Sequence, residues 1–228
     1  MRSALKKSAP GRGFERELWD GGCETVVGID EVGRGAWAGP LTLAAVVVPR
    51  SKRLHGVRDS KMLSAGERAE MAVRIGDWAD HVSVGQSSAA ECDELGMSAA
   101  QKIAAQRALA GLGCRVDHVL VDGNWDFVET VPTTMLVKGD AKSISIAAAS
   151  IVAKHTRDQF MIEAAARYPS YWFHRNKGYP CPRHKAALAG VGPSAIHRRR
   201  WAFMDDLRWS GQPRIVDDDA ETPQLELF

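Results

Sequence analysis

The sequence predicts an α/β domain in which helices cover both faces of a mixed β-sheet. Short apolar, β-branched runs bounded by glycine or proline are typical of buried strands. Two such runs follow each other across a short turn, and the later runs alternate with helical segments, which together favour a mixed sheet. At 228 residues, 45% of them hydrophobic and 25% charged, the chain is long enough for one such domain with additional segments.

The first elements are expected to be an arm and two strands. Residues 1–20 are basic, contain glycine and proline and lack a clear period, so we expect a loosely ordered arm. Residues 25–32 form an apolar run that continues across a glycine-rich turn into a second run at 41–48. Because the connection is short, the two strands should be antiparallel neighbours.

Helices and further strands are expected after a polar loop. A Ser-x-x-Glu capping box starts a helix at 64–79, and 81–86 alternates like a strand. An alanine-rich helix should run over 98–112, capped by Ser98, with a shorter helix possible at 89–95. The remaining elements are strands at 117–121 and 134–137, a long helix at 143–166, and short helices at 182–189 and 194–207.

Composition indicates a cytoplasmic protein without a membrane segment. Its four cysteines lie far apart with no C-x-x-C pair, which argues against a zinc site and for reduced thiols; they are Cys23, Cys92, Cys114 and Cys181. No apolar signal region follows the basic N-terminus, and no apolar run is long enough to span a bilayer.

Charge is unevenly distributed, although the net charge is only +2. Residues 168–200 contain seven lysines and arginines, no acid, and several interleaved aromatic residues. This pattern suits nucleic-acid phosphates and bases. A solvated basic face that packs a few aromatic side chains would give the same pattern.

Acidic residues recur at the ends of predicted strands. Asp30 and Glu31 end the first strand, Asp122 follows the third, and Asp140 follows the next. Converging carboxylates repel one another unless they protonate or bind a hard cation, and an oxygen-only set favours Mg²⁺ or Mn²⁺. Two such ions roughly 3.5–4 Å apart support in-line phosphodiester hydrolysis by water. Structural salt bridges or unrelated surface acids are the alternative.

The adjacent pair carries a geometric constraint. Successive strand residues point to opposite faces, so Asp30 and Glu31 cannot both reach one site from a regular strand. We therefore expect the strand to twist or end there. Gly33 and Gly35 permit a bend and a close approach of the backbone to a ligand.

Several short blocks occur along the chain in a specific order: Gly28-Ile29-Asp30-Glu31-Val32-Gly33-Arg34-Gly35, Asp59-Ser60-Lys61, Val121-Asp122-Gly123, Lys138-Gly139-Asp140, residues 147–154 with Arg157-Asp158, Lys177-Gly178-Tyr179 and His197-Arg198-Arg199. In this order they resemble bacterial ribonuclease HII, the type 2 ribonuclease H family, over about residues 24–208. The resemblance implies a ribonuclease H-like fold. It also implies hydrolysis of RNA paired to DNA, including cleavage 5′ to a single embedded ribonucleotide, leaving 3′-OH and 5′-phosphate ends.

The resemblance assigns roles to individual residues. Asp30, Glu31, Asp122 and Asp140 are implied as the catalytic acids that bind Mn²⁺ or Mg²⁺, two ions in the substrate complex. Backbone groups of Gly33-Arg34-Gly35 would read the ribose 2′-OH, and Tyr179 would pack on the sugar at the RNA–DNA junction.

Other positions are weaker candidates. The phosphate contacts that we expect are Ser60, Lys61, Lys138, Lys142 and Lys177, although a loop lysine is often simply solvated. Asp158 follows Lys154 at i, i+4, so we expect a structural ion pair. The histidines lack metal-ligand spacing.

Composition, charge and the resemblance together suggest four parts. These are the arm at 1–20, a ribonuclease H-like catalytic domain at 21–167, a basic and aromatic helical substrate-binding segment at 168–209, and an acidic flexible tail at 210–228. The tail ends in apolar anchors on a polar segment: Gln224, Leu225, Leu227 and Phe228. This ending resembles the peptide by which bacterial replication proteins bind the sliding clamp, where tethering raises local concentration on DNA. Docking of the tail on its own domain is the alternative.

Two other functions remain open. A DNA integrase or junction resolvase could share the fold, but the Gly33-Arg34-Gly35 loop and Tyr179 argue against it. A non-catalytic nucleic-acid and clamp adaptor would not need four acids. We expect RNA/DNA hybrid and ribonucleotide-containing DNA as substrates, and a monomer.

Overall fold

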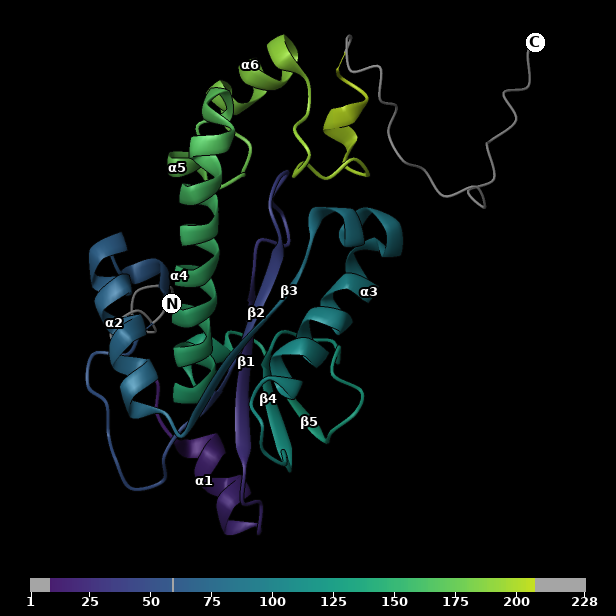
Figure 1. Cartoon of the computed structure of the whole chain (residues 1–228). Helices are drawn as coiled ribbons and strands as arrows, with labels where there is room; N and C mark the ends of the chain where they lie inside the picture. The colour runs from purple at the N-terminus through teal and green to yellow at the C-terminus, as the bar shows by residue number, and fades with distance from the viewer. Residues whose placement is uncertain (1–8, 59, 208–228) are drawn as a thin grey trace, which may run out of the picture.

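Five strands form one mixed sheet at the centre of the molecule (Figure 1). The computed structural model describes residues 9–58 and 60–207. In chain order the strands are β1 (Val26–Val32), β2 (Leu41–Val47), β3 (His81–Ser87), β4 (His118–Asp122) and β5 (Thr133–Leu136). Their order across the sheet is β3-β2-β1-β4-β5, antiparallel from β3 to β1 and parallel from β1 to β5. The predicted mixed sheet and its antiparallel first pair are confirmed.

Helices cover both faces of this sheet (Figure 1). One face packs against α3 (Ala89–Ala110), and the other packs against α2 (Ala65–Trp78) and α4 (Ile144–Arg167). Along β2, Leu43 belongs to the α3 core and its neighbour Ala44 to the α2 and α4 core. Every residue of β2 is buried, which explains its unbroken apolar sequence. No helix in the described part of the chain is long and apolar enough to cross a bilayer.

The predicted helix starts are largely confirmed. Ser64 and Glu67 form a capping box at α2, and Ser143 caps α4. A second capping box at Ser88 starts α3, ten residues before the predicted cap at Ser98. A break at Gly96 (φ 79°, ψ 160°) separates the short and long helical stretches that the sequence predicts.

The N-terminal region differs from the prediction of a loosely ordered arm. Residues 13–20 form a helix, α1 (Gly13–Asp20), and the side chain of Glu15 is fully buried. Glu15 Oε1 accepts hydrogen bonds from Ser143 Oγ at 2.5 Å and from Ser145 N and Oγ at 3.0 and 2.7 Å. The arm is thus anchored to the N-terminus of α4 by one acid, a contact that charge composition cannot reveal.

The C-terminal segment packs as a small separate core at the far end of α4 (Figure 1). It contains η3 (Pro169–Tyr171), α5 (Phe173–Asn176), α6 (Pro182–Val191) and η4 (Ala202–Met204). The helix predicted at 182–189 is confirmed, but the helix predicted at 194–207 is wrong apart from η4. There the backbone pairs with residues 37–39 instead: Gly39 N donates to Ile196 O at 2.8 Å, and Arg198 N donates to Trp37 O at 2.8 Å.

Candidate active site

Asp30 and Glu31 lie near the carboxyl end of β1 and make contacts on opposite faces of the sheet. Asp30 is hydrogen-bonded to Ser150 of α4. Glu31 Oε2 accepts a hydrogen bond from Gln101 Nε2 of α3 at 3.1 Å. The strand does not end at these acids, since its pairing with β2 continues to Val32.

Asp122, the last residue of β4, links the two acids electrostatically. Burial raises the pKa of Asp30 well above its ordinary value, and the charges of Asp122 and Glu31 raise it further against the opposing effect of the Ser150 bond. Burial also raises the pKa of Glu31, with a contribution from Asp122, while Arg34 opposes the shift. The carboxylates of Asp30, Glu31 and Asp122 therefore repel one another and form one acidic group, although Asp30 and Glu31 contact opposite faces of the sheet.

Asp140 lies beside this group in a short turn, η2 (Gly139–Ala141). Gly139 N donates to Asp122 Oδ1 at 2.7 Å, so the turn is held against the end of β4. Asp140 is buried, and Lys61 Nζ lies 3.9 Å from its Oδ2. Lys138 and Lys142 are exposed at the two ends of the turn.

A second turn, η1 (Ser60–Met62), connects to two of the acids. Ser60 Oγ lies 2.9 Å from Ser150 Oγ, and Ser150 in turn bonds Asp30. Lys61 extends from the same turn to Asp140. The structure thus brings Ser60 and Lys61 to the acidic group, while their predicted contact with a phosphate stays a prediction. Asp59 lies outside the described residues.

The loop that follows β1 runs beside Glu31. Arg34 Nη1 donates to Gln101 Oε1 at 2.6 Å, and Gln101 also bonds Glu31. Gly33 has φ 91°, and a Cβ there would lie 2.1 Å from Arg157 Nε, so only glycine fits. At Gly35 an added Cβ would meet nothing within 4 Å, so the backbone there is open to a ligand.

Arg157 joins this loop to the segment that carries Tyr179. Its side chain is fully buried and donates to the carbonyl oxygens of Ala38, Pro40 and Lys177, each at 2.9 Å. Its guanidinium carbon lies 5.3 Å from the centre of the Tyr179 ring. Burial lowers the pKa of Arg157 to about 10, so the group remains charged at neutral pH.

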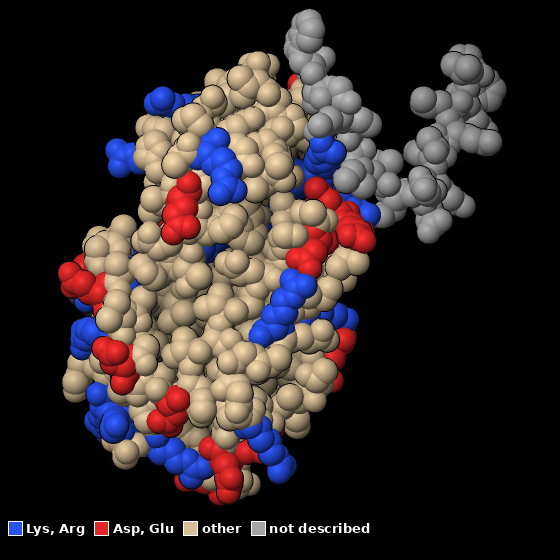
Figure 2. Space-filling view, in the orientation of Figure 1, with Lys and Arg blue, Asp and Glu red and all other residues tan. Residues whose placement is uncertain are grey.

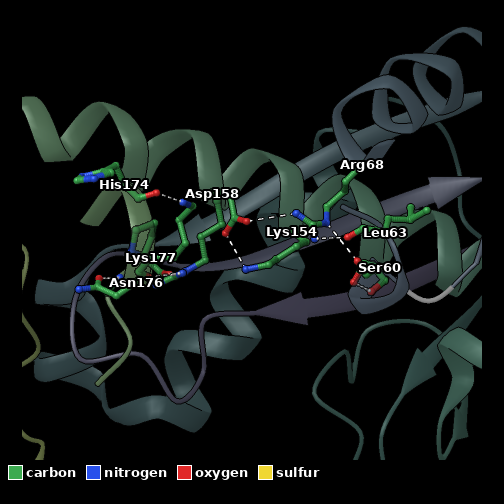
Figure 3. A network of polar contacts seen from close by, with 12 residues as sticks. Ser60, Leu63, Arg68, Lys154, Asp158, His174, Asn176 and Lys177 are labelled. Carbon is green, nitrogen blue, oxygen red and sulfur yellow. Dashed lines mark hydrogen bonds and ion pairs between the residues drawn. The ribbon is translucent and has the colours of Figure 1, made fainter. Parts of the chain in front are cut away.

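Asp158 lies in a network of cations (Figure 3). It forms ion pairs with Lys154 at 2.7 Å and with Arg68 at 3.5 Å. Arg68 Nε also donates to Ser60 O at 3.2 Å, so the network supports the η1 turn. Lys177 lies in the same region and donates to the carbonyl of His174. The predicted Lys154–Asp158 pair is confirmed.

The basic C-terminal segment is not uniformly a solvent-exposed face. Arg198 is fully buried and donates to Arg34 O at 2.9 Å, and Asp93 accepts from the backbone amides of Arg199 and Arg200. On the face shown in Figure 2, acidic and basic side chains are interspersed.

The acids fit a hard cation by their chemistry. Among the described residues, no three His, Cys, Asp or Glu side chains are already gathered around one point where an ion could bind. The carboxylates of Asp30, Glu31 and Asp122 instead accept hydrogen bonds from protein donors. The donor set is nonetheless oxygen only, partly buried and mutually repelling, which suits Mg²⁺ or Mn²⁺.

Some contacting residues were not singled out in the sequence. Ser150 and Arg157 lie in blocks that carry the family resemblance; the sequence predicts for Ser150 only close packing of the long helix on the sheet, and for Arg157 no contact. Gln101 lies in an alanine-rich helix that gives no signal of a site. The predicted clamp-binding residues at 224–228 lie outside the described residues.

Comparison with known proteins decides the family. The family model described as Ribonuclease HII matches residues 27–204. The chain belongs to the ribonuclease HII family. A ribonuclease HII of Streptomyces griseus is 45% identical over 211 residues, covering 90% of this chain and 89% of the relative.

Solved structures of ribonucleases share the fold. Ribonuclease H2 of Pyrococcus horikoshii OT3 matches with a TM-score of 0.68 and 28% identity, covering 80% of this chain and 96% of that protein. Ribonuclease HII in the PCNA:RNase HII complex of Archaeoglobus fulgidus matches with a TM-score of 0.68 and 27% identity, covering the same shares. The chain is therefore an endoribonuclease of RNA/DNA hybrids with a ribonuclease H-like fold, and the integrase and adaptor readings are set aside.

Proposed function

We propose that the chain cleaves the phosphodiester 5′ to a ribonucleotide, both in hybrids and at single ribonucleotides within duplex DNA, leaving 3′-OH and 5′-phosphate ends. Asp30, Glu31, Asp122 and Asp140 are the proposed catalytic acids. The observation that carries this proposal is the acidic group itself, in which burial and the charge of Asp122 on β4 raise the pKa of Asp30 and Glu31 on the adjacent strand β1, beside a loop open to a ligand. All of these residues come from one chain, in keeping with a monomer.

In this proposal the acids hold Mg²⁺ or Mn²⁺, two ions in the substrate complex. Bound there, the ions would activate the attacking water and stabilise the leaving oxygen. The side chains would exchange their protein donors, such as Gln101 for Glu31 and the Gly139 amide for Asp122, for contacts to the ions. Lys61 beside Asp140 compensates part of the negative charge.

Two segments are proposed to recognise the sugar. The backbone of Gly33-Arg34-Gly35 would bind the ribose 2′-OH, because the loop is fixed by Arg157 and Arg198 while Gly35 faces open space. Tyr179 would pack on the sugar at the RNA–DNA junction. Its ring lies over the cations of Arg157 and Lys154, which also favour a nearby phosphate.

Proposed phosphate contacts surround the acids. Lys61, Lys138 and Lys142 lie on the two turns that hold Asp140, and Ser60 lies beside Lys61. Burial lowers the pKa of Lys177, and the nearby charges of Lys154, Arg175 and Arg68 lower it further, while Asp158 opposes the shift. An approaching phosphate would relieve this repulsion.

The test is cleavage of a duplex that bears one ribonucleotide, with and without Mg²⁺ or Mn²⁺, beside an all-DNA duplex and an all-RNA/DNA hybrid. We expect metal-dependent cutting of the two ribonucleotide-containing substrates, with the single cut mapped 5′ to the ribonucleotide. Equal cutting of the all-DNA duplex, or cutting on the 3′ side, would refute the proposal.

We further propose that residues 224–228 bind a sliding clamp. The ending Gln-Leu-Glu-Leu-Phe carries the apolar anchors, and a solved relative forms a PCNA:RNase HII complex. Deleting these residues should abolish retention by a purified bacterial clamp while leaving nuclease activity unchanged. Undiminished retention would end this proposal.

A further inference from the structure

Two buried histidines in the C-terminal segment form a direct hydrogen bond. His184 of α6 is 0% exposed, and His197 is 3% exposed. Their Nε2 atoms lie 2.9 Å apart. Neither residue contacts the acidic group, and apolar packing alone does not explain a polar pair in this position, because burying imidazoles has a desolvation cost that only their hydrogen bonds offset.

The partners of the pair determine the direction of every hydrogen bond. His184 Nδ1 lies 2.9 Å from Tyr179 O, which can only accept, so Nδ1 carries the hydrogen. In the neutral ring, His184 Nε2 then accepts from His197 Nε2. His197 Nδ1 is left to accept from Ser194, whose N and Oγ lie at 2.9 and 2.7 Å. One chain of bonds therefore runs from Ser194 through both rings to Tyr179 O.

The surroundings keep both rings neutral and fixed. Burial lowers the pKa of His184, and burial together with His184 lowers the pKa of His197 to about 3. Tyr171 and Phe173 pack against both rings, with ring centres 4.7–6.1 Å apart. Trp37, from the loop after β1, packs on His184 at 5.7 Å. The imidazoles thus have little freedom to change partner.

We propose that His184 and His197 are positioning residues that determine substrate preference by fixing the backbone carbonyl of Tyr179. Arg157 Cζ and Lys154 Nζ lie 5.3 and 6.0 Å from the centre of the Tyr179 ring. His184 Nδ1 donates a hydrogen bond to the backbone carbonyl of Tyr179. The carbonyl bond orients the residue, and the cations orient its ring. This inference rests on the proposed contact of Tyr179 with the sugar at the junction.

Two substitutions of His184 distinguish the roles of its two ring nitrogens. The amide of His184→Asn lies near the place of Nδ1 and can donate to Tyr179 O, whereas the amide of His184→Gln lies near the place of Nε2 and leaves Tyr179 O without its donor. The measured quantity is the ratio of kcat/KM on a single-ribonucleotide duplex to that on an all-RNA/DNA hybrid. Tyr179→Ala and the double variant Tyr179→Ala/His184→Gln complete the set.

We expect Tyr179→Ala to lower the ratio about tenfold, as the loss of one stacking contact implies. His184→Gln should lower the ratio in the same direction, His184→Asn should retain it, and the double variant should be no worse than Tyr179→Ala. Leu188→Ala is the matched control, because Leu188 is buried in the same core. It should lower the melting temperature without changing the ratio.

The outcomes are distinguishable. An unchanged ratio in Tyr179→Ala refutes the proposed contact with the sugar. A lowered ratio in Tyr179→Ala with an unchanged ratio in His184→Gln refutes the positioning role, as does an equal loss in Leu188→Ala or in His184→Asn. If the His184 variants do not fold, His197→Asn places its amide near the position of Nδ1 and removes the Nε2 donor to His184. It should lower the ratio measurably, and an unchanged ratio there also refutes the role.

Discussion

Asp30 is buried beside two further carboxylates, and its raised pKa reflects an unfavourable charge in the metal-free fold. A carboxyl whose pKa is higher in the folded than in the unfolded state favours folding below the unfolded pKa of about 3.9 and loses that contribution as pH rises through the folded pKa. The buried carboxyl of Asp30 is therefore expected to lower the stability of the metal-free protein at neutral pH. Binding of a cation would offset this destabilisation.

Asp30→Asn should consequently stabilise the metal-free protein at pH 7.5 while abolishing turnover. Each kcal/mol of relieved repulsion corresponds to a rise of about 2–4 °C in melting temperature for a chain of this size. The difference from wild type should shrink towards pH 4, because wild-type Asp30 is then protonated. Thermal unfolding in EDTA at both pH values checks this, with exposed Asp80→Asn as the control. A lower melting temperature for Asp30→Asn at pH 7.5 would contradict it.

The guanidinium of Arg157 donates hydrogen bonds to the loop after β1 and to the segment at Lys177, in a planar geometry that lysine cannot reproduce. Its three carbonyl partners are Ala38, Pro40 and Lys177. Arg157→Lys keeps the charge but leaves buried carbonyls unpaired, so the free energy of unfolding should fall by about 1–3 kcal/mol. Urea unfolding measures the loss, and Arg74→Lys on the surface of α2 is the control. Equal stability of the two variants would show that this planar geometry is dispensable.

Residue positions in the site could be predicted where the strand pattern marks them. Asp30, Glu31, Asp122 and Asp140 stand at strand ends, and the structure brings them to the same end of β1 and β4. Gln101 and His184 carry no such mark, because their importance comes from a partner far along the chain.

At the scale of elements, α1 depends on one buried acid. Glu15→Ala removes the acceptor of three hydrogen bonds from Ser143 and Ser145. Unpaired donors at the start of α4 should lower the free energy of unfolding by about 1–3 kcal/mol. Glu17→Ala, an exposed acid of the same helix, serves as the control. Denaturant unfolding of both variants should show a loss only for Glu15→Ala, and similar stabilities would contradict the anchoring role.

The contact between β1 and α4 requires a residue without a side chain. A Cβ at Gly28 would lie 2.2 Å from Ser145 C and 2.4 Å from Ile146 N, both backbone atoms. Gly28→Ala should therefore lose at least about 3 kcal/mol or fail to fold. Gly76→Ala is the matched control, since an added Cβ on α2 meets nothing within 4 Å and should gain about 0.5–1 kcal/mol. Soluble Gly28→Ala with wild-type stability would contradict this packing.

Elements with a local signal could be predicted, and those set by distant contacts could not. Capping boxes and apolar runs locate α2 and the strands. Residues 194–201 have no helix because their backbone bonds the loop at 37–39 and Asp93. Likewise α1 forms in a basic stretch because Glu15 is buried at another helix. In both cases tertiary contacts override composition.

At the scale of the whole molecule, the sheet places the acids at one end, and Arg157 links the loop after β1 to the C-terminal segment. The fold class could be predicted because alternation of strands and helices constrains the layers. The sequence could not predict that Asp122 influences both Asp30 and Glu31, which contact opposite faces of the sheet. This depends on how far β4 extends beside β1.

The central claim is that these acids together hold the ions on which hydrolysis depends, and calorimetric titration of the metal-free protein with Mn²⁺ tests it most directly. We expect wild type to bind Mn²⁺, and Asp122→Asn to bind it at least about tenfold more weakly and to be inactive on the single-ribonucleotide duplex. Asp158→Asn, outside the acidic group, should bind Mn²⁺ like wild type. Unchanged Mn²⁺ affinity in Asp122→Asn, or an equal loss in Asp158→Asn, would contradict the claim.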